Sequence, residues 1–447
     1  MVEIGLHPSG CTEDKGALQY AGELSGNEEA VVLIAAIVVT ILILLLSWGR
    51  MAWWSLKIAV WYPLPQPAAD AALRKWPKAV VLLPLRGSDP MLLDCLRGLC
   101  RQDYPNFEIG LILDSQDDEA WGPVREAISE FPRVRIHPQV LTERLETCSL
   151  KSSALLQAVR SLPPDVEVVA VIDADVMAKP WWLRELVRPL LDDVQLGAVC
   201  GLRWFLPHQK NCGSVIRQVW NAAASAQMYA LSIPWGGSMA YRADLLREPG
   251  FQQRWAETFV EDVSITQELG CRGRKLRMVP QLSMVNTETI SVVGCFRFMR
   301  RQIFSVRMYN PAWWPVMLTC FGMVLSCVLA AIVSPAAMRG GLPLVARGIP
   351  SLLGLLIAVT TVPLLYTEYC LRPPKSCIRY AIETAFIHVP LIIATILLYA
   401  AAVFSACTIR EIDWRGIRYE IGRGGSIRRL NDAPYRSRTP GATESLL

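Results

Sequence analysis

Histidine is scarce in this chain of 447 residues, which contains only four. Imidazole is the commonest metal ligand in proteins, so this scarcity argues against a histidine-built metal centre. The 13 cysteines include no CxxC pair, and most lie in apolar settings such as those of Cys95 and Cys320. We therefore expect buried free thiols in a reducing compartment rather than disulfides or a zinc site.

Nucleic-acid-binding motifs and internal repeats are also absent from the sequence. The net charge of +5 is modest and fits an anionic membrane surface at least as well as a nucleic acid. We predict no nucleic-acid partner and look instead for contacts with a bilayer.

Long apolar runs are abundant, in keeping with an apolar content of 52%. Residues 30–48 (AVVLIAAIVVTILILLLSW) carry no charge, and about 20 apolar residues suffice to cross a bilayer core roughly 30 Å thick. This run starts too far from the N-terminus, and lacks the basic leader, to be a cleaved signal peptide. Further apolar runs occupy 312–335, 349–366 and 381–404. We therefore predict a multi-pass integral membrane protein.

Charge around the first run predicts its orientation. The segment before residue 30 has six acidic residues against the single Lys15, whereas Arg50 and Lys57 follow the run closely. Basic residues stay on the cytoplasmic side, so the roughly 260 residues between the first two runs should form a cytoplasmic domain.

The C-terminal runs are harder to reconcile with the rule that basic residues stay on the cytoplasmic side. Three crossings after the domain would place the arginine-rich tail on the opposite side of the membrane. Either one run is re-entrant and broken at Pro350, Pro363 or Pro390, or the tail is an exception to the rule. Both solutions are compatible with the sequence.

Short apolar runs alternate with helical patterns inside the predicted cytoplasmic domain. KAVVLLPLRG (78–87), FEIGLILDSQDD (107–118) and VEVVAVIDADV (166–176) are typical of buried strands that end in polar or glycine residues. MLLDCLRGLCRQ (91–102) and LKSSALLQAVRSL (150–162) have helical spacing. This alternation predicts an α/β fold with a mostly parallel sheet, in which ligands bind at the carboxyl ends of the strands.

Acidic residues stand at these strand ends. Asp114 follows one apolar run, and Asp173 and Asp175 follow a neighbouring one. Carboxylates gathered at one edge of a sheet repel each other unless a cation lies among them, and their hard oxygens suit Mg²⁺ or Mn²⁺. Such an ion would keep coordination sites for a diphosphate. Asp117 and Asp118 are instead expected to cap a turn, which is a common use of aspartate.

Motifs follow one another in a fixed order across residues 78–310: PLRGSDPMLLDCLRGLCRQDYPNFEIGLILDSQDD, LKSSAL, VIDADV, WGGSMAYRADLL and ETFVEDVSITQEL. In this order they resemble the family 2 type of inverting glycosyltransferases with a GT-A fold, and most of all the ceramide glucosyltransferase branch. A DxD pair alone would be a weak signal, but the ordered set is specific.

The resemblance implies roles for the acidic residues. Asp114 would contact the nucleotide, and Asp173 and Asp175 would bind the metal and the sugar diphosphate. Asp262, preceded by Glu261, would be the base that takes a proton from the attacking hydroxyl. The alternative for this last pair is a helix N-terminus, where acids favour the helix dipole, and both uses can hold at once.

Two further motifs gain a role from the resemblance. Lys151 would lie near the nucleotide, with a surface lysine as the alternative. Residues 236–238, Gly237 among them, would let the backbone approach the donor sugar and the acceptor, with a plain glycine turn as the alternative.

Arginines alternate with apolar residues in CFRFMRRQIFSVRMYNPAWW (295–314), which predicts an amphipathic helix on the cytoplasmic membrane surface. Related enzymes carry a Q/RxxRW motif here that contacts diphosphate and acceptor. Arg297 and Arg300 match its first and fourth positions, Arg301 stands where tryptophan is expected, and Gln302 follows. We expect Arg300 to be the first of these in the site, and binding of lipid head groups is the alternative for Arg297 and Arg307.

These observations predict a metal-dependent, membrane-bound inverting glycosyltransferase that moves one sugar from a nucleotide donor, UDP-glucose, to a lipid hydroxyl of the ceramide or diacylglycerol kind. A processive polysaccharide synthase and a polyprenyl-phosphate glycosyltransferase are the alternatives within the superfamily. An inactive membrane scaffold is the alternative outside it, and the presence of all four aspartates, Asp114, Asp173, Asp175 and Asp262, argues against it.

The predicted organisation has six parts. They are an acidic N-terminal segment (1–29), a membrane anchor (30–50), a GT-A domain (75–295), an interfacial helix (296–311), transmembrane helices (312–404) and a basic, partly disordered tail (405–447). Within the tail, IDWRGIRYEI (412–421) resembles a short strand-like element of bacterial relatives. If this element packs on the catalytic domain, its arginines are cytoplasmic and the re-entrant solution is favoured.

Overall fold

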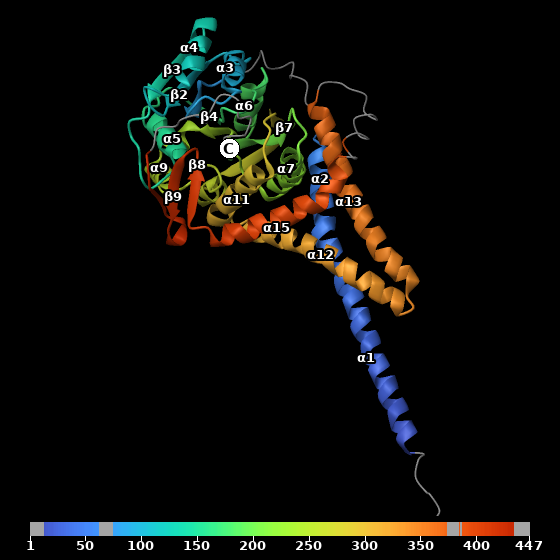
Figure 1. Cartoon of the computed structure of the whole chain (residues 1–447). Coiled ribbons are helices and arrows are strands. Elements are labelled where there is room, and N and C mark those ends of the chain that lie inside the picture. The colour runs from blue at the N-terminus through green and yellow to red at the C-terminus, as the bar shows by residue number, and fades with distance from the viewer. Residues whose placement is uncertain (1–12, 62–74, 373–383, 385–386, 433–447) are drawn as a thin grey trace, which may run out of the picture.

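A seven-stranded sheet lies at the centre of the computed structural model, which describes residues 13–61, 75–372, 384 and 387–432. Its order is β3-β2-β1-β4-β6-β5-β7, and only β6 runs antiparallel to its neighbours (Figure 1). The predicted α/β fold with a mostly parallel sheet is therefore confirmed. The strands are β1 (Ala79–Leu85), β2 (Phe107–Leu113), β3 (Ile136–Val140), β4 (Val168–Ile172), β5 (Leu196–Phe205), β6 (Ser238–Arg242) and β7 (Lys275–Asn286).

Helices cover both faces of this sheet. Because crossover connections are right-handed, α3 and α4 cover one face as the chain moves from β1 to β3, and α5 covers the other on the return to β4. The side chain of Ser149 caps α5 by accepting the Ser152 N–H at 3.1 Å. The helices are α3 (Leu92–Cys100), α4 (Trp121–Glu130), α5 (Leu150–Arg160), α6 (Trp182–Asp192), α7 (Cys212–Leu231), α8 (Ala243–Arg247), α9 (Pro249–Ala256) and α10 (Ile265–Cys271).

Three apolar helices extend away from the α/β domain (Figure 1). Helix α1 (Glu13–Leu44) continues through a π-helical turn into α2 (Arg50–Ala59), followed much later by α12 (Trp313–Arg339) and α13 (Pro343–Leu371). Within the part of the chain that the structure describes, Glu28–Ala59, α12 and α13 are long and apolar enough to cross a membrane, by length and composition. They match the first three predicted runs.

The fourth predicted run differs from the other three. Helix α15 (Ile392–Thr408) has 17 residues and follows a 3₁₀ turn that contains Pro390. It packs against α11 beneath the α/β domain (Figure 1). Of the three prolines considered as places for a re-entrant break, Pro350 and Pro363 lie inside the continuous helix α13, so the chain is not broken at either. Most of the fourth run before residue 387, the first 12 residues, and the tail from residue 433 that was expected to be disordered lie outside the described residues.

Helix α11 (Val292–Tyr309) confirms the predicted amphipathic helix but not the surface it contacts. Its buried Phe298 meets Phe205 of β5 edge to face, with ring centroids 5.6 Å apart. The apolar side of α11 therefore packs inside the protein and not against a bilayer, because Phe205 at the end of the sheet provides an aromatic surface for it.

A second, antiparallel sheet follows α15. It consists of β8 (Glu411–Trp414), β9 (Ile417–Ile421) and β10 (Ile427–Arg429). The ring centroid of Phe259 in the α/β domain lies 5.5 Å from that of Trp414 and 5.3 Å from that of Tyr419. The strand-like element predicted at 412–421 is confirmed, and it packs on the α/β domain.

Candidate active site

A cavity of about 210 Å³ opens where β1, β2 and β4 end. Asp114 directly follows β2 and Asp173 directly follows β4, so parallel strands deliver both to the same edge of the sheet. Asp175 and Asp262 line the same cavity. The carboxylates thus meet at one edge, as the pattern of strands predicted.

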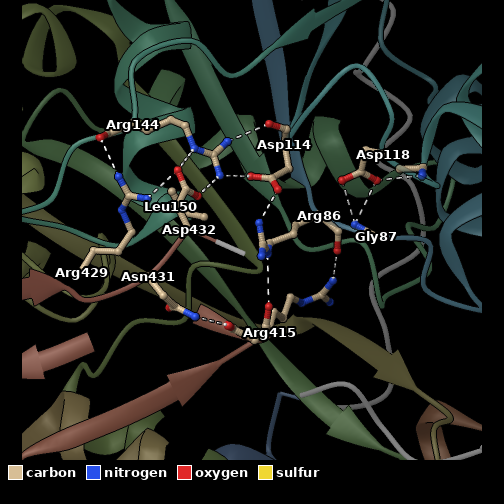
Figure 2. A network of polar contacts seen from close by, with 12 residues as sticks. Arg86, Gly87, Asp114, Asp118, Arg144, Leu150, Arg415, Arg429, Asn431 and Asp432 are labelled. Carbon is tan, nitrogen blue, oxygen red and sulfur yellow. Dashed lines mark hydrogen bonds and ion pairs between the residues drawn. The ribbon is translucent and has the colours of Figure 1, made fainter. Parts of the chain in front are cut away.

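Asp114 is held by two arginines at one end of the cavity (Figure 2). It is buried and forms ion pairs with Arg86 and, at 3.0 Å, with Arg144. Asp118 nearby accepts the Gly87 N–H at 3.0 Å and the Ala120 N–H at 2.8 Å. Asp118 therefore has the predicted turn-capping role, whereas Asp114 faces the cavity.

Lys151 connects two acidic segments. Its Nζ lies 2.8 Å from Asp173 Oδ1 and 2.8 Å from Glu261 Oε1. Burial alone lowers the pKa of Lys151, but the charges of Asp173 and Glu261 outweigh it, so the pKa is raised and the side chain stays charged. This lysine lines the cavity instead of projecting from the surface.

Asp173 and Asp175 are two carboxylates whose charges repel each other. Burial, and then the charge of Asp173, raises the pKa of Asp175 to about 7, while Lys151 helps to keep the pKa of Asp173 low. Asn286 Nδ2 donates to Asp175 Oδ2 at 3.0 Å and orients it. Among the described residues no group of three His, Cys, Asp or Glu side chains could hold a metal alone. The donor set fits a divalent cation that takes its remaining oxygens from a diphosphate.

Asp262 is a buried carboxylate with spare hydrogen-bonding capacity. Its Oδ2 accepts the Gly236 N–H, and its buried Oδ1 has no hydrogen-bond partner among the described residues. Burial, followed by the charge of Glu261, raises the pKa of Asp262 to about 7. The side chain does not cap the following helix, because α10 begins after Ser264.

The glycines before β6 lie against these carboxylates. A Cβ on Gly237 would be 2.1 Å from the ring of Trp235 and 2.5 Å from Asp173 Oδ2, and one on Gly236 would be 2.5 Å from Glu261 Oε1. Only glycine leaves room for this close backbone approach. The turn at residues 236–238 therefore holds the acidic groups at their positions.

The arginines of α11 divide between the cavity and the outside. Arg301 and Gln302 line the cavity, whereas Arg297 is exposed and Arg300 is not among the lining residues. We expected Arg300 to be the first of these arginines in the site, but Arg301 takes that place, because the helix turns Arg301 toward the strand ends.

Three polar residues at the site were missed from the sequence. Arg203 is buried in β5 and lines the cavity, Asn286 ends β7, and Arg415 reaches the cavity from the second sheet. A lone arginine inside the apolar run LGAVCGLRWF was a signal for Arg203, since a buried charge needs a partner. Nothing in the local pattern marked the other two.

The opposite end of the cavity is apolar. Met228 and Ile233 line it, together with Val316 of α12 and Tyr399 of α15. A second cavity of about 90 Å³ lies among the apolar helices. Both cavities share Trp220, Ala224, Gln227 and Tyr399 as wall residues.

Comparisons with known proteins agree with this fold. These comparisons place the chain among the glycosyltransferases, as predicted. More narrowly, the chain belongs to glycosyl transferase family 21, whose family model matches residues 31–427.

Relatives of known sequence support the predicted ceramide glucosyltransferase branch. Ceramide glucosyltransferase 1 of Caenorhabditis elegans is 21% identical over 234 residues, which cover 51% of this chain and 49% of that protein. Ceramide glucosyltransferase of Gibberella zeae is 27% identical over 139 residues, which cover 28% of this chain and 26% of that protein. The chain thus matches about half the length, or less, of these relatives.

Solved structures show more distant similarity. A mannosyltransferase from Pyrobaculum calidifontis, in complex with GDP-Man and Mn²⁺, is 18% identical with a TM-score of 0.46 and covers 85% of this chain and 97% of that one. Glucosyl-3-phosphoglycerate synthase from Mycobacterium tuberculosis, in complex with Mg²⁺ and UDP, is 14% identical with a TM-score of 0.34 and covers 52% of this chain and 84% of that one.

Replacing Gly237 by alanine should destabilise the site. The added Cβ has to displace the Trp235 ring or Asp173, so we expect Gly237→Ala to lower the free energy of unfolding by on the order of 1–3 kcal/mol. Gly270→Ala is the matched control, because its Cβ meets nothing within 4 Å in helix α10. Thermal unfolding of both proteins in the same detergent checks this, and equal midpoints would contradict it.

Proposed function

We propose that this chain is a membrane-bound inverting glycosyltransferase that transfers one sugar, glucose from UDP-glucose, to the hydroxyl of a membrane lipid of the ceramide or diacylglycerol kind. The observation that carries the proposal is the position of Asp262. This buried carboxylate has an Oδ1 without a hydrogen-bond partner in the described chain and shares one cavity with the Asp173 and Asp175 pair. Membership in family 21 supports the reaction class.

The donor would bind across the polar end of the cavity. Asp114, held by Arg86 and Arg144, would face the nucleoside, and Lys151 would lie beside the phosphates. Asp173 and Asp175 would hold the divalent cation, Mg²⁺ or Mn²⁺. When bound, this cation would stabilise the negative charge that develops on the leaving diphosphate.

Asp262 would act as the general base. The acceptor oxygen forms a bond to the anomeric carbon while the bond from that carbon to the β-phosphate oxygen breaks, and the hydroxyl proton passes to Asp262 Oδ1. The Gly236 N–H holds the other carboxylate oxygen and so fixes the direction of Oδ1. A base in a segment separate from the metal-binding acids suits a single displacement with inversion, because the acceptor attacks the face opposite the leaving group.

The acceptor would reach the base from the apolar end of the cavity. Val316 and Tyr399 come from helices that continue into the apolar bundle, so the wall is continuous with the surface that lipids would contact. The second cavity extends this apolar surface toward α2 and α13. A membrane lipid could therefore present its hydroxyl to Asp262 while its chains stay among apolar side chains.

The fold also supports a cytoplasmic orientation for the α/β domain and the tail. The second sheet packs on the α/β domain, so both lie on the same side of a membrane. Two crossings, by α12 and α13, return the chain to that side, and α15 lies along the domain. This arrangement satisfies the positive-inside rule for the arginine-rich tail.

Loss of the Asp262 carboxylate should abolish transfer. Purified protein in lipid vesicles containing ceramide or diacylglycerol, given labelled UDP-glucose and Mn²⁺, should form one discrete glycolipid on lipid chromatography. We expect Asp262→Asn to reduce kcat by a factor of about 10²–10⁴ and to spare UDP binding. Asp244→Asn, on the exposed start of α8, is the control that should keep full activity.

Other products of this assay would revise the proposal. Labelled polymer that stays at the origin would favour the processive synthase. Absence of transfer to any lipid from any nucleotide sugar would favour an inactive scaffold.

Transfer should depend on pH through Asp262. Burial and Glu261 raise the pKa of this base to about 7, and only its deprotonated form accepts a proton, so kcat should rise with pH up to about 7 and level off above it. At pH 6 we expect about a tenth of the plateau value. Steady-state rates at saturating donor, lipid and Mn²⁺ test this, and a constant kcat from pH 6 to 8 would contradict it.

Narrowing the passage between the two cavities should impair the acceptor alone. Ala224 lines both cavities, so the larger side chain of Ala224→Phe should raise the apparent KM for the lipid by on the order of tenfold while leaving UDP affinity unchanged. Ala230→Phe, on the same helix but away from both cavities, is the control. Titration of the lipid in mixed micelles measures the effect, and an equal change in both variants would argue against this path.

A further inference from the structure

Three arginines from three separate segments converge on the candidate active site. Arg203 belongs to β5, Arg301 to α11 and Arg415 to the turn between β8 and β9, and all line the main cavity. The guanidinium carbons of Arg203 and Arg301 lie 4.9 Å and 6.0 Å from the centre of the Phe298 ring. Arg301 also lies 5.5 Å from the Trp414 ring. Aromatic rings thus hold the guanidinium groups of Arg203 and Arg301 in place.

The positive charge of this group is only partly compensated. Within the part of the chain that the structure describes, neither Arg203 nor Arg301 forms an ion pair with a carboxylate, and the buried Nε of Arg203 has no hydrogen-bond partner. Burial, and then the charges of Arg203 and Arg415, lowers the pKa of Arg301. Positive charges that line one cavity favour the binding of an anion among them.

Arg415 reaches the cavity through an unusual turn. Arg415 and Gly416 form the two-residue connection between β8 and β9, with φ of 51° and 77°. Such turns favour Asn, Asp or Gly at the first position, and an arginine there carries a conformational cost. Its guanidinium donates to the Arg86 carbonyl oxygen at 2.7 Å and pairs with Asp89 at 2.6 Å. The turn is therefore held beside the end of β1.

The second sheet is anchored at its other end as well (Figure 2). Asp432 pairs with Arg144 at 2.5 Å and with Arg429 at 2.8 Å, and Arg144 in turn pairs with Asp114 at 3.0 Å. The segment from β8 to Asp432 thus contacts the end of β1 directly and is connected to the end of β2 through Arg144. Bidentate arginine–carboxylate contacts of this kind fix orientation as well as distance.

We propose that the second sheet completes the nucleotide site, with Arg415 binding the phosphate groups of a nucleoside diphosphate together with Arg203 and Arg301. This inference rests on the proposed function, because it assigns the anion to the donor. Arg415 is the member of the group that the tail delivers, and its planar fork of donors suits phosphate oxygens.

Binding of UDP and of uridine to the full-length protein in detergent, measured by calorimetry with Mn²⁺, tests the proposal. Arg415→Ala should weaken UDP binding on the order of ten- to a hundredfold, the range for a charge-assisted contact, and leave uridine binding unchanged. Arg415→Lys should recover part of the loss. Arg418→Ala, exposed on β9 of the same sheet, should bind both ligands as the unaltered protein does.

A glycine variant separates a structural role from a binding role. Arg415→Gly removes the same guanidinium contacts as Arg415→Ala but relieves the positive φ, so its thermal unfolding midpoint should lie above that of Arg415→Ala while UDP binding is weakened to the same extent. Equal losses for UDP and uridine, or no loss for either, would overturn the proposal. The proposal would also be overturned if the unaltered protein bound no nucleoside diphosphate more tightly than the corresponding nucleoside. If GDP binds in place of UDP, the choice of donor fails, and the same variants tested with GDP and guanosine decide the role of Arg415.

Discussion

The burial of like-charged carboxylates at one edge of a sheet is the constraint on which the rest of this structure depends. Each such group costs free energy unless a positive charge or a hydrogen bond lies beside it. Lys151 meets this need for Asp173 and Glu261 at once, with both contacts at 2.8 Å. It thereby ties α5 to the loop after β4 and to the segment before α10. The glycine turn before β6 leaves the space that these carboxylates need.

Much of the α/β domain could be predicted because its signals are local. The apolar runs that became β1, β2 and β4 lie within a few residues of their predicted bounds, since strands buried on both faces are apolar throughout. The same regularity located Asp114, Asp173 and Asp175, because parallel strands end at one edge. The antiparallel β6 left no such signal, as a strand's direction depends on the path of the chain around it.

The features that could not be predicted depend on contacts between segments that are distant in the sequence. Whether Arg300 or Arg301 faces the cavity is decided by the rotation of α11, which is set by Phe298 against Phe205 and not by the spacing of the arginines. Whether the apolar side of α11 faces lipid or protein is likewise decided by the residues of distant segments that bury it. Arg415 lies more than 200 residues from Asp173 and Asp175 along the chain, and only the return of the tail over the strand ends brings it near.

That return has a consequence for biosynthesis. A chain emerging from the ribosome contains every residue of the α/β domain long before β8, β9 and β10 are made, and the apolar helices α12, α13 and α15 stand between the two. Arg415 and the other tail residues that line the polar end of the cavity reach it only after the last of these helices has taken its place. A product cut short anywhere before Glu411 would carry the acidic residues in a site open to water, so completion of the chain and formation of the finished pocket become one event.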